Sequence, residues 1–246
     1  MTEPTAGKPR AQRPRDHVVS TLAKQILAGE FQPGEKLPSE ADLGEQLSVS
    51  RTALRESIRT LAGKGLIASR TRSGTVVQPS VQWNHLDPEL LAWRETLEPD
   101  FQFIRSLNEV RQVIEPAAAM LAAERATSQD LAAIESGYAG MCAAPVDDIE
   151  SAVKADEAFH FAVLVASHNP FYATFGSVIG SALRISFRLT TSASENFAKT
   201  LDMHGEVLEA IRMRKPVAAG EVMTRLVSLA CSDLARVIKQ NGGDYA

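Results

Sequence analysis

The sequence predicts a mainly α-helical protein, with an N-terminal winged helix-turn-helix and a C-terminal all-α bundle of about six helices. Two observations support this fold class. Between Lys36 and Val77, two short helical patterns are followed by two short strand-like runs around the turn RTRSG, which is the order of elements in a winged helix-turn-helix. From Phe101 onward the apolar pattern has a helical period and contains nothing typical of a strand.

The charge of the chain is divided unevenly. The formal net charge is -4 over 246 residues, yet residues 1–80 contain 12 Lys and Arg against 8 Asp and Glu, whereas residues 81–246 contain 14 against 22. The positive charge that binds phosphates is therefore concentrated at the N-terminal end, and the acidic remainder is repelled by a nucleic-acid duplex. This distribution favours a DNA-binding domain followed by a domain with another task.

Composition also predicts the compartment. No apolar run approaches the ~18 residues needed to span a membrane, and no apolar segment follows the basic N-terminus as it does in a secretory signal. Two cysteines, Cys142 and Cys231, in a long chain favour a reducing compartment. We therefore expect a cytoplasmic protein that does not bind a membrane.

The first elements follow in order along the chain. Residues 1–14 are rich in Pro, Lys and Arg without periodicity, so we expect a disordered arm. A first helix is predicted over residues 16–28, ended by Gly29. A second helix is predicted after Ser39, a suitable N-cap with Asp42 three residues later.

The third helix has the pattern of a DNA-reading helix. Ser50 is suited to cap its start, and Leu54, Ile58 and Leu61 form the stripe that a short helix buries. Polar residues near the start of such a helix meet base edges when the helix enters a major groove with its N-terminus first. The candidates on the other face are Arg51, Thr52, Arg55 and Arg59.

A hairpin follows this helix. Gly65 ends the helix, and residues 66–69 and 75–78 read as two short strands. Arg70 and Arg72 then lie at the tip of the hairpin, where the wing of a winged helix contacts DNA. We expect the DNA-binding domain to span residues 15–78.

These residues resemble the DNA-binding domain of the GntR family of bacterial transcription regulators, over about residues 15–78. The resemblance rests on PGEKLPSEADLGEQLSVSRTALRESIRTLAGKGLI followed by RTRSGTVV. It implies that Ser50, Arg51, Thr52, Arg55 and the wing from Arg70 through Gly74 contact the operator. Many members of the fatty-acid-regulator branch have an arginine where this chain has Ala41, so the operator sequence of that branch cannot be transferred.

The rest of the chain divides into a linker and a helical domain. Residues 79–100 contain three prolines and the run WNHLDPELLAW, which predict a linker with a short helix over residues 87–96. The helical pattern of residues 101–246 is broken at TSQD, AAPVDD, HNP, TSASEN and RKP, which divide it into about six helices. We expect an effector-binding and dimerisation domain there.

Four polar residues lie on the apolar stripes of these predicted helices, where a charge is costly unless it is paired or functional. Asp156 and His160 are one turn apart on one stripe, and a histidine from another helix could complete a set of ligands around a divalent ion. The inward polar residues are Arg111, Asp156, His160 and His204.

This second domain is similar to the ligand-binding FCD domain of the FadR-like subfamily, whose DxxxH motif and later histidines bind a metal. Asp156, His160 and His204 match three of its four ligands, and the fourth position falls on Leu226. Two alternatives stay open: three ligands and waters hold an ion such as zinc or nickel, or the site is a purely hydrogen-bonding pocket.

A finer resemblance lies in WNHLDPELLAW, in EVRQVIEPAAAMLAAERATSQDLAAIE and in SHNP, which look like regulators of sugar-acid catabolism of the galactonate-operon-repressor type. It implies an aldonate or a similar hydroxy acid as effector. Arg111 can supply a bidentate contact to a carboxylate, and further polar side chains can bind hydroxyl groups. The candidates for hydroxyl binding are Asp156, His160, His204, Asn169 and Arg184.

We therefore expect a repressor that binds a palindromic operator as a homodimer, since one short helix reads only a few base pairs. We expect a sugar acid to release this repressor from its operator. Two other regulators remain as alternatives: one in which a metal ion is itself the signal, and one that responds to another carboxylate such as lactate. An enzyme with a metal at Asp156, His160 and His204 is disfavoured because no nucleophile or general base stands out near them.

Overall fold

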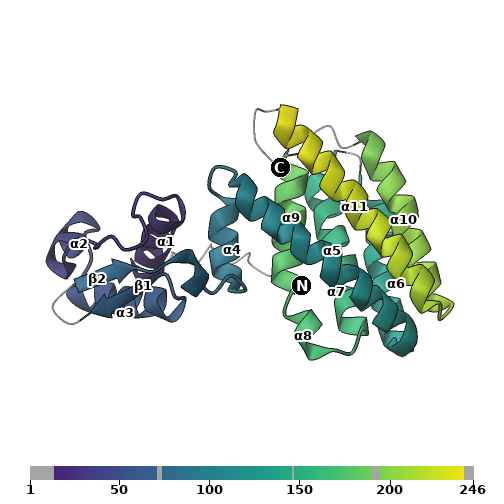
Figure 1. Ribbon diagram of the computed structural model, residues 1–246, viewed down its shortest axis with the longest axis horizontal. Coiled ribbons are helices and arrows are strands. Elements are labelled where there is room, and N and C mark those ends of the chain that lie inside the picture. The colour runs from purple at the N-terminus through teal and green to yellow at the C-terminus, as the bar shows by residue number, and fades with distance from the viewer. Residues whose placement is uncertain (1–13, 71–73, 146, 190–193, 241–246) are drawn as a thin grey trace, which may run out of the picture. The chain divides into compact units, whose positions relative to one another are not determined.

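The computed structural model describes residues 14–70, 74–145, 147–189 and 194–240. The chain divides into two compact units, Met1–Leu97 and Glu98–Ala246. Their elements are labelled in Figure 1. The predicted fold class is confirmed, with a small winged helix-turn-helix in the first unit and an all-α bundle in the second.

The described residues of the first unit form four α-helices, a two-stranded antiparallel sheet and a short 3-10 helix. In the sheet, Ile67 pairs with Val77 and Arg70 pairs with Gly74. The elements are α1 (Pro14–Leu27), α2 (Glu40–Gln46), α3 (Arg51–Gly63), β1 (Ile67–Arg70), β2 (Gly74–Val77), η1 (Ser80–Gln82) and α4 (Pro88–Glu95).

Side-chain caps begin α2 and α3 where the sequence predicts them. The Ser39 hydroxyl accepts a hydrogen bond from the Asp42 amide at 3.2 Å, and the Ser50 hydroxyl accepts one from the Ala53 amide at 3.3 Å. Each cap satisfies an amide that has no partner within its own helix. Both predicted caps are therefore confirmed.

The predicted stripe of α3 is buried in the core of the first unit. Leu54, Ile58 and Leu61 pack there with Val19, Leu22 and Ile26 of α1. Gly65 ends the helix with a φ of +79°, and a Cβ atom there would lie 2.1 Å from the carbonyl oxygen of Gln82. Both the left-handed backbone and this close approach require glycine.

The segment predicted as a linker is packed on the first unit as far as Leu97. Trp83 and Leu90 are buried in the core of that unit. The Lys64 ammonium at the end of α3 lies 2.7 Å from carboxylate oxygens of both Asp87 and Glu89. The short helix was predicted, but its apolar face gave no indication of which surface it would cover.

The described residues of the second unit form six long helices and one single helical turn at the predicted HNP break. Its elements are α5 (Phe101–Arg125), α6 (Ser128–Ala143), α7 (Ile149–Ala166), α8 (Pro170–Ala173), α9 (Gly176–Leu189), α10 (Ser194–Arg212) and α11 (Pro216–Gln240). The predicted break near TSASEN falls partly on residues 190–193, which lie outside the described residues.

Small residues let these helices approach closely. Four alanines of α5 are fully buried in the core of the unit, and α5 packs along α11, as Figure 1 shows. A Cβ atom on Gly137 of α6 would lie 2.6 Å from the backbone nitrogen of Phe159 in α7. This contact fixes the part of α7 that holds His160. Among the described residues, no helix is both long enough and apolar enough to cross a membrane.

Candidate functional site

The first candidate site is the outward face of α3. Its predicted DNA-contacting residues are all exposed, whereas the stripe on the opposite face is buried. This is the arrangement of a helix that packs on its own domain with one face and offers the other to a partner. The exposed candidates are Ser50, Arg51, Thr52, Arg55 and Arg59.

Glu40 orients one of these arginines. Its Oε2 atom lies 2.9 Å from Nε of Arg55, although both side chains remain largely exposed. The sequence reasoning missed Glu40, because an acidic residue in the first turn of a helix is already explained by the helix dipole. Ala41 beside it is exposed and offers no polar side chain.

The wing is formed by β1 and β2. Arg70 ends β1 and Gly74 begins β2 with a φ of +81°, a left-handed conformation that suits glycine at a hairpin turn. The side chain of Arg70 and all of Arg72 lie outside the described residues, so their roles stay predictions.

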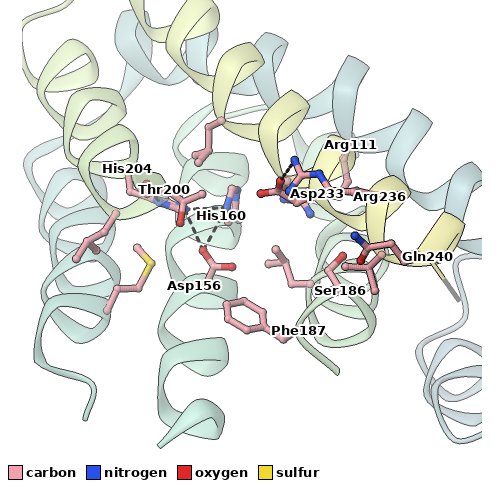
Figure 2. Close-up of a pocket in the computed structure, with 16 residues that line it drawn as sticks. Arg111, Asp156, His160, Ser186, Phe187, Thr200, His204, Asp233, Arg236 and Gln240 are labelled. Carbon is pink, nitrogen blue, oxygen red and sulfur yellow. Dashed lines mark hydrogen bonds and ion pairs between the residues drawn. The ribbon is translucent and has the colours of Figure 1, made fainter. Parts of the chain in front are cut away.

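The second candidate site is a cavity of about 260 Å³ in the second unit. Figure 2 shows its lining. All four inward polar residues that the sequence singled out, Arg111, Asp156, His160 and His204, line it, and so does Leu226. Charged residues from the apolar stripes of α5, α7 and α10 are thus brought together around one space.

Asp156, His160 and His204 present three ligand atoms to a common point. Asp156 Oδ1 lies 2.9 Å from His204 Nε2 and 3.5 Å from His160 Nε2, and the two Nε2 atoms are 3.2 Å apart. Ligands about 2.0–2.1 Å from a tetrahedral zinc ion lie about 3.3–3.4 Å from each other. The donor set therefore fits a divalent ion held from one side.

Acceptors behind both histidines direct their Nε2 atoms toward that point. Nδ1 of His204 lies 2.6 Å from the carbonyl oxygen of Thr200, and Nδ1 of His160 contacts the Glu115 carboxylate. A proton on each Nδ1 atom satisfies these acceptors and leaves Nε2 to carry the lone pair. Carboxylates and carbonyls behind metal-binding histidines have this role in proteins.

Arg111 pairs with Glu115, which also contacts His160. Its Nε atom lies 2.6 Å from Oε1 of Glu115, and these side chains are only 2% and 1% exposed. The Nη1 atom of Arg111 is buried without a hydrogen-bond partner among the described residues. One edge of the guanidinium is therefore anchored, and a buried donor at the cavity remains to be satisfied.

Glu115 is a site residue that the sequence reasoning missed. It follows Arg111 by four residues, so the two share one face of α5. This spacing was an available signal, since a carboxylate one turn after an inward arginine is its natural partner.

The charges of the buried residues Arg111, Glu115, Asp156 and His160 balance each other. Burial acts to raise the pKa of Glu115, but the charges of Arg111 and His160 lower it to about 2. Burial acts to lower the pKa of His160, but Glu115 and Asp156 raise it to about 9. Contacts with His160 and His204 outweigh burial and hold the pKa of Asp156 well below its usual range. Without an ion, Arg111 and a protonated His160 thus compensate the two carboxylates of Glu115 and Asp156.

This balance predicts a pH dependence of stability in metal-stripped protein. The stabilisation due to His160 is complete below its ordinary pKa of 6.5 and is lost as the pH rises through about 9. That due to Glu115 is complete above 4.5 and is lost as the pH falls through about 2. We expect the unfolding midpoint, followed by circular dichroism, to fall between about pH 6.5 and 9. His168→Gln, which changes an exposed histidine, should leave this decrease unchanged, and a flat midpoint over this window in both proteins would contradict the proposed charge state.

Two predicted effector contacts lie away from the cavity lining. Arg184 Nη1 is 2.7 Å from Glu157 Oε2 on a half-exposed surface, and the Asn169 side chain caps α8 by accepting a hydrogen bond from the Phe171 amide at 3.1 Å. Neither residue lines the cavity. Leu226 is buried and offers no ligand atom at the fourth position.

Several polar lining residues had not been singled out from the sequence. On α11, Leu226, Ala230, Asp233, Val237 and Gln240 recur at helical spacing along one face. The helical spacing of these residues was visible in the sequence, but nothing indicated that Asp233 and Gln240 belong to a site. The additional polar residues are Ser186, Thr200, Asp233, Arg236 and Gln240.

Two family models match this chain, one in each unit. Residues 14–77 match the model of the bacterial regulatory proteins of the gntR family, and residues 106–229 match the FCD domain. The chain belongs to the GntR family. The FCD match contains Arg111, Asp156, His160 and His204 of the cavity, whereas the lining residues from Ala230 onward lie beyond it, and the gntR match contains α3 and the wing. This GntR-family chain is a DNA-binding transcriptional regulator, not an enzyme.

Relatives with 30–39% sequence identity match between 79% and 90% of the chain. The galactonate operon transcriptional repressor of Escherichia coli is 39% identical over 90% of this chain and 97% of its own length. The regulator LutR of Bacillus subtilis is 33% identical over 79% of this chain and 86% of its own. An Escherichia coli protein provisionally named as the regulator of an L-lactate dehydrogenase operon is 30% identical over 81% of this chain and 78% of its own length.

Among solved structures, that of Lar, which controls the expression of the Listeria monocytogenes agr system, covers 94% of this chain and 99% of its own, with a TM-score of 0.67. At 20% sequence identity this similarity supports the fold alone.

Proposed function

We propose that this GntR-family chain is a repressor of a sugar-acid catabolic operon and that an aldonate, such as galactonate, releases it from its operator. The observation that carries the proposal is the buried Nη1 atom of Arg111, which has no hydrogen-bond partner among the described residues and belongs to a residue lining a cavity. A buried, unsatisfied guanidinium donor favours an anionic ligand. The similarity to the galactonate repressor supports an aldonate.

The cavity suits a small polar ligand. Its volume of about 260 Å³ lies just below the ~300–1,000 Å³ of pockets for drug-sized ligands. Arg111 can bind the carboxylate, while His204, Thr200 and Ser186 offer partners for hydroxyl groups. The buried charged side chains of Arg111, Asp156 and His160 in the lining disfavour a long acyl chain.

The same residues would hold a divalent ion. Asp156, His160 and His204 are the ligands in this proposal, and Glu115 and Thr200 orient the histidines. Since Leu226 contributes no donor, the remaining positions are open to oxygen atoms of a ligand. A zinc or nickel ion there would supply a Lewis-acidic contact to the effector carboxylate.

Operator binding is proposed to require a homodimer in the cytoplasm. One α3 helix reads a single half-site of a few base pairs, so two copies related by a two-fold axis match a palindromic operator. Effector binding in the FCD domain would favour a placement of the two DNA-binding units that does not match the half-site spacing.

Two alternative signals are tested by the same experiment. The regulator could respond to a metal ion alone, which the three converging ligands favour, or to a short hydroxy acid, which the similarity to the provisional L-lactate operon regulator favours. Both alternatives use the same cavity.

The test is a thermal-shift panel of aldonates, uronates and lactate on metal-stripped protein, repeated with Zn²⁺ or Ni²⁺. The proposal predicts that aldonates raise the unfolding midpoint most, because a ligand that binds only the folded state stabilises it. Stabilisation by the metal without any further effect of an acid would support the metal-responsive alternative. A larger shift with lactate than with any aldonate would contradict the sugar-acid assignment.

A further inference from the structure

The start of α1 is fixed to the flank of α3. Nη2 of Arg15 donates a hydrogen bond to the hydroxyl oxygen of Thr60 at 2.9 Å, and the hydroxyl oxygen of Ser57 lies 3.3 Å from the carbonyl oxygen of Arg15. Ser57 is fully buried, and residues of α1 and α3 pack together in the core of the first unit. The chain therefore enters the first unit beside the helix that is predicted to meet DNA.

Thr60 lies at the edge of the exposed face of α3. Successive side chains of an α-helix are about 100° apart around its axis, and Thr60 follows the exposed Arg59 directly. Thr60 is half-buried, whereas Arg15 is exposed. Arg15 is thus an exposed cation that is held next to the predicted DNA-contacting residues, although it comes from another helix.

The residues before Pro14 add further positive charge at this place. Residues 1–13, which we call the basic arm, lie outside the described residues, and their sequence contains Lys8, Arg10 and Arg13 against the single acidic residue Glu3. A chain spans at most ~3.3–3.6 Å per residue, so the Cα atom of Lys8 lies within about 25 Å of that of Arg15 in any conformation. Three more cations are therefore confined to the neighbourhood of α3.

The composition of the basic arm favours phosphate groups as its partner. Apart from Met1 it contains no aromatic or long aliphatic side chain, so it has little apolar surface to bury against a protein. A reach of 25 Å covers about seven base pairs at ~3.4 Å each, and cations spread over this length can neutralise several phosphates and release their counterions. Contacts of this kind strengthen binding to any DNA sequence.

We propose that the basic arm and Arg15 form a second, sequence-independent contact with DNA, in which Thr60 holds Arg15 beside the phosphates that flank the groove entered by α3. This inference requires that α3 meets DNA, but it does not depend on the effector proposed above. It adds a set of phosphate contacts to the residues of α3 and the wing.

Two variants and a matched control separate this contact from a general effect of charge. The arm variant Lys8→Gln/Arg10→Gln/Arg13→Gln removes three positive charges, and Thr60→Val removes the hydroxyl group that holds Arg15. The control removes three positive charges from the second unit, at exposed residues that pair with glutamates. It is Arg105→Gln/Lys154→Gln/Arg225→Gln.

The experiment measures the affinity of the full-length proteins for a selected operator and for a random duplex by fluorescence anisotropy over a series of salt concentrations. Each phosphate contact contributes about 0.9 to the slope of log K against log salt concentration. We expect the arm variant to reduce this slope by about 1 or more and to weaken both DNAs by the same factor, about tenfold or more at ~0.1 M salt. Thr60→Val should cause a smaller loss in the same direction, and the control should behave like the wild type.

The other outcomes would overturn the inference. An unchanged slope and affinity in the arm variant would show that the arm does not contact DNA, and tighter binding would indicate that it contacts the acidic part of the chain instead. A loss confined to the operator would indicate base reading, and an equal loss in the control would indicate a general effect of charge. The core of the first unit begins at Val18, so the unfolding midpoint of the arm variant should match that of the wild type. Arg51→Ala, measured in parallel, should weaken the operator more than the random duplex and so reports separately on α3.

Discussion

Replacing Arg111 with methionine is expected to abolish the effector response while operator binding is retained. Removal of one partner of a buried, charge-assisted contact costs about 2–5 kcal/mol of ligand affinity, and in the proposed function Arg111, which lines the cavity and has a buried Nη1 atom without a partner among the described residues, binds the effector carboxylate. The effector concentration that releases half of the operator, measured by fluorescence anisotropy, should rise beyond the accessible range.

Stability must be separated from binding in this test, because Arg111→Met also leaves Glu115 without its ion pair. Breaking a buried pair in this way costs about 3–5 kcal/mol. The double variant Arg111→Met/Glu115→Gln removes both charges and should regain much of the lost stability, while the effector response stays absent. Arg184→Met, which breaks a half-exposed ion pair outside the cavity, is the matched control and should respond normally. A normal response in the double variant would show that Arg111 does not bind the effector.

Alanine at Arg51 or Arg55 is expected to weaken operator binding by about 1–3 kcal/mol in each half-site if the arginine reads a base. Both side chains are exposed on α3, and Glu40 holds the guanidinium of Arg55 at 2.9 Å. The proposed homodimer presents each arginine twice, so the loss should double on a palindromic operator. Gel-shift titrations at fixed salt concentration measure it.

The controls for this prediction come from the same chain. Arg225→Ala removes an exposed arginine of the second unit and should leave the affinity unchanged, whereas Glu40→Gln should cause a smaller loss than Arg55→Ala because it only frees the arginine that it orients. Unchanged affinity for both Arg51→Ala and Arg55→Ala would remove these residues from the operator interface.

Local sequence signals were sufficient for most of the fold. Ser39 and Ser50 marked the starts of two helices because side-chain caps act within three residues, and the stripe of Leu54, Ile58 and Leu61 marked the buried face of α3. The packing of residues 79–97 on the first unit could not be predicted in the same way. Trp83 and Leu90 have apolar side chains that would suit a linker helix or a domain core equally well.

The site followed from a different kind of signal. Arg111, Asp156, His160 and His204 were found because each interrupts an apolar stripe, and a charge buried there needs a partner or a function. The partners themselves were harder to predict. Glu115 shares a face with Arg111, but its contact with His160 joins two helices, and the carbonyl oxygen of Thr200 has no side-chain signal. Asp233 lines the cavity only because of where α11 packs beside its neighbours, which is set by tertiary packing.

The most direct test of the account is release of operator DNA by a sugar acid. An operator selected from random DNA is bound by the purified full-length protein, and galactonate is titrated into metal-stripped and zinc-loaded samples while fluorescence anisotropy reports the bound fraction. We predict saturable release by galactonate in the wild type and none in Arg111→Met/Glu115→Gln. Unchanged operator binding by the wild type at saturating concentrations of every aldonate, with and without metal, would contradict the assignment of this cavity as the sensor of a sugar acid.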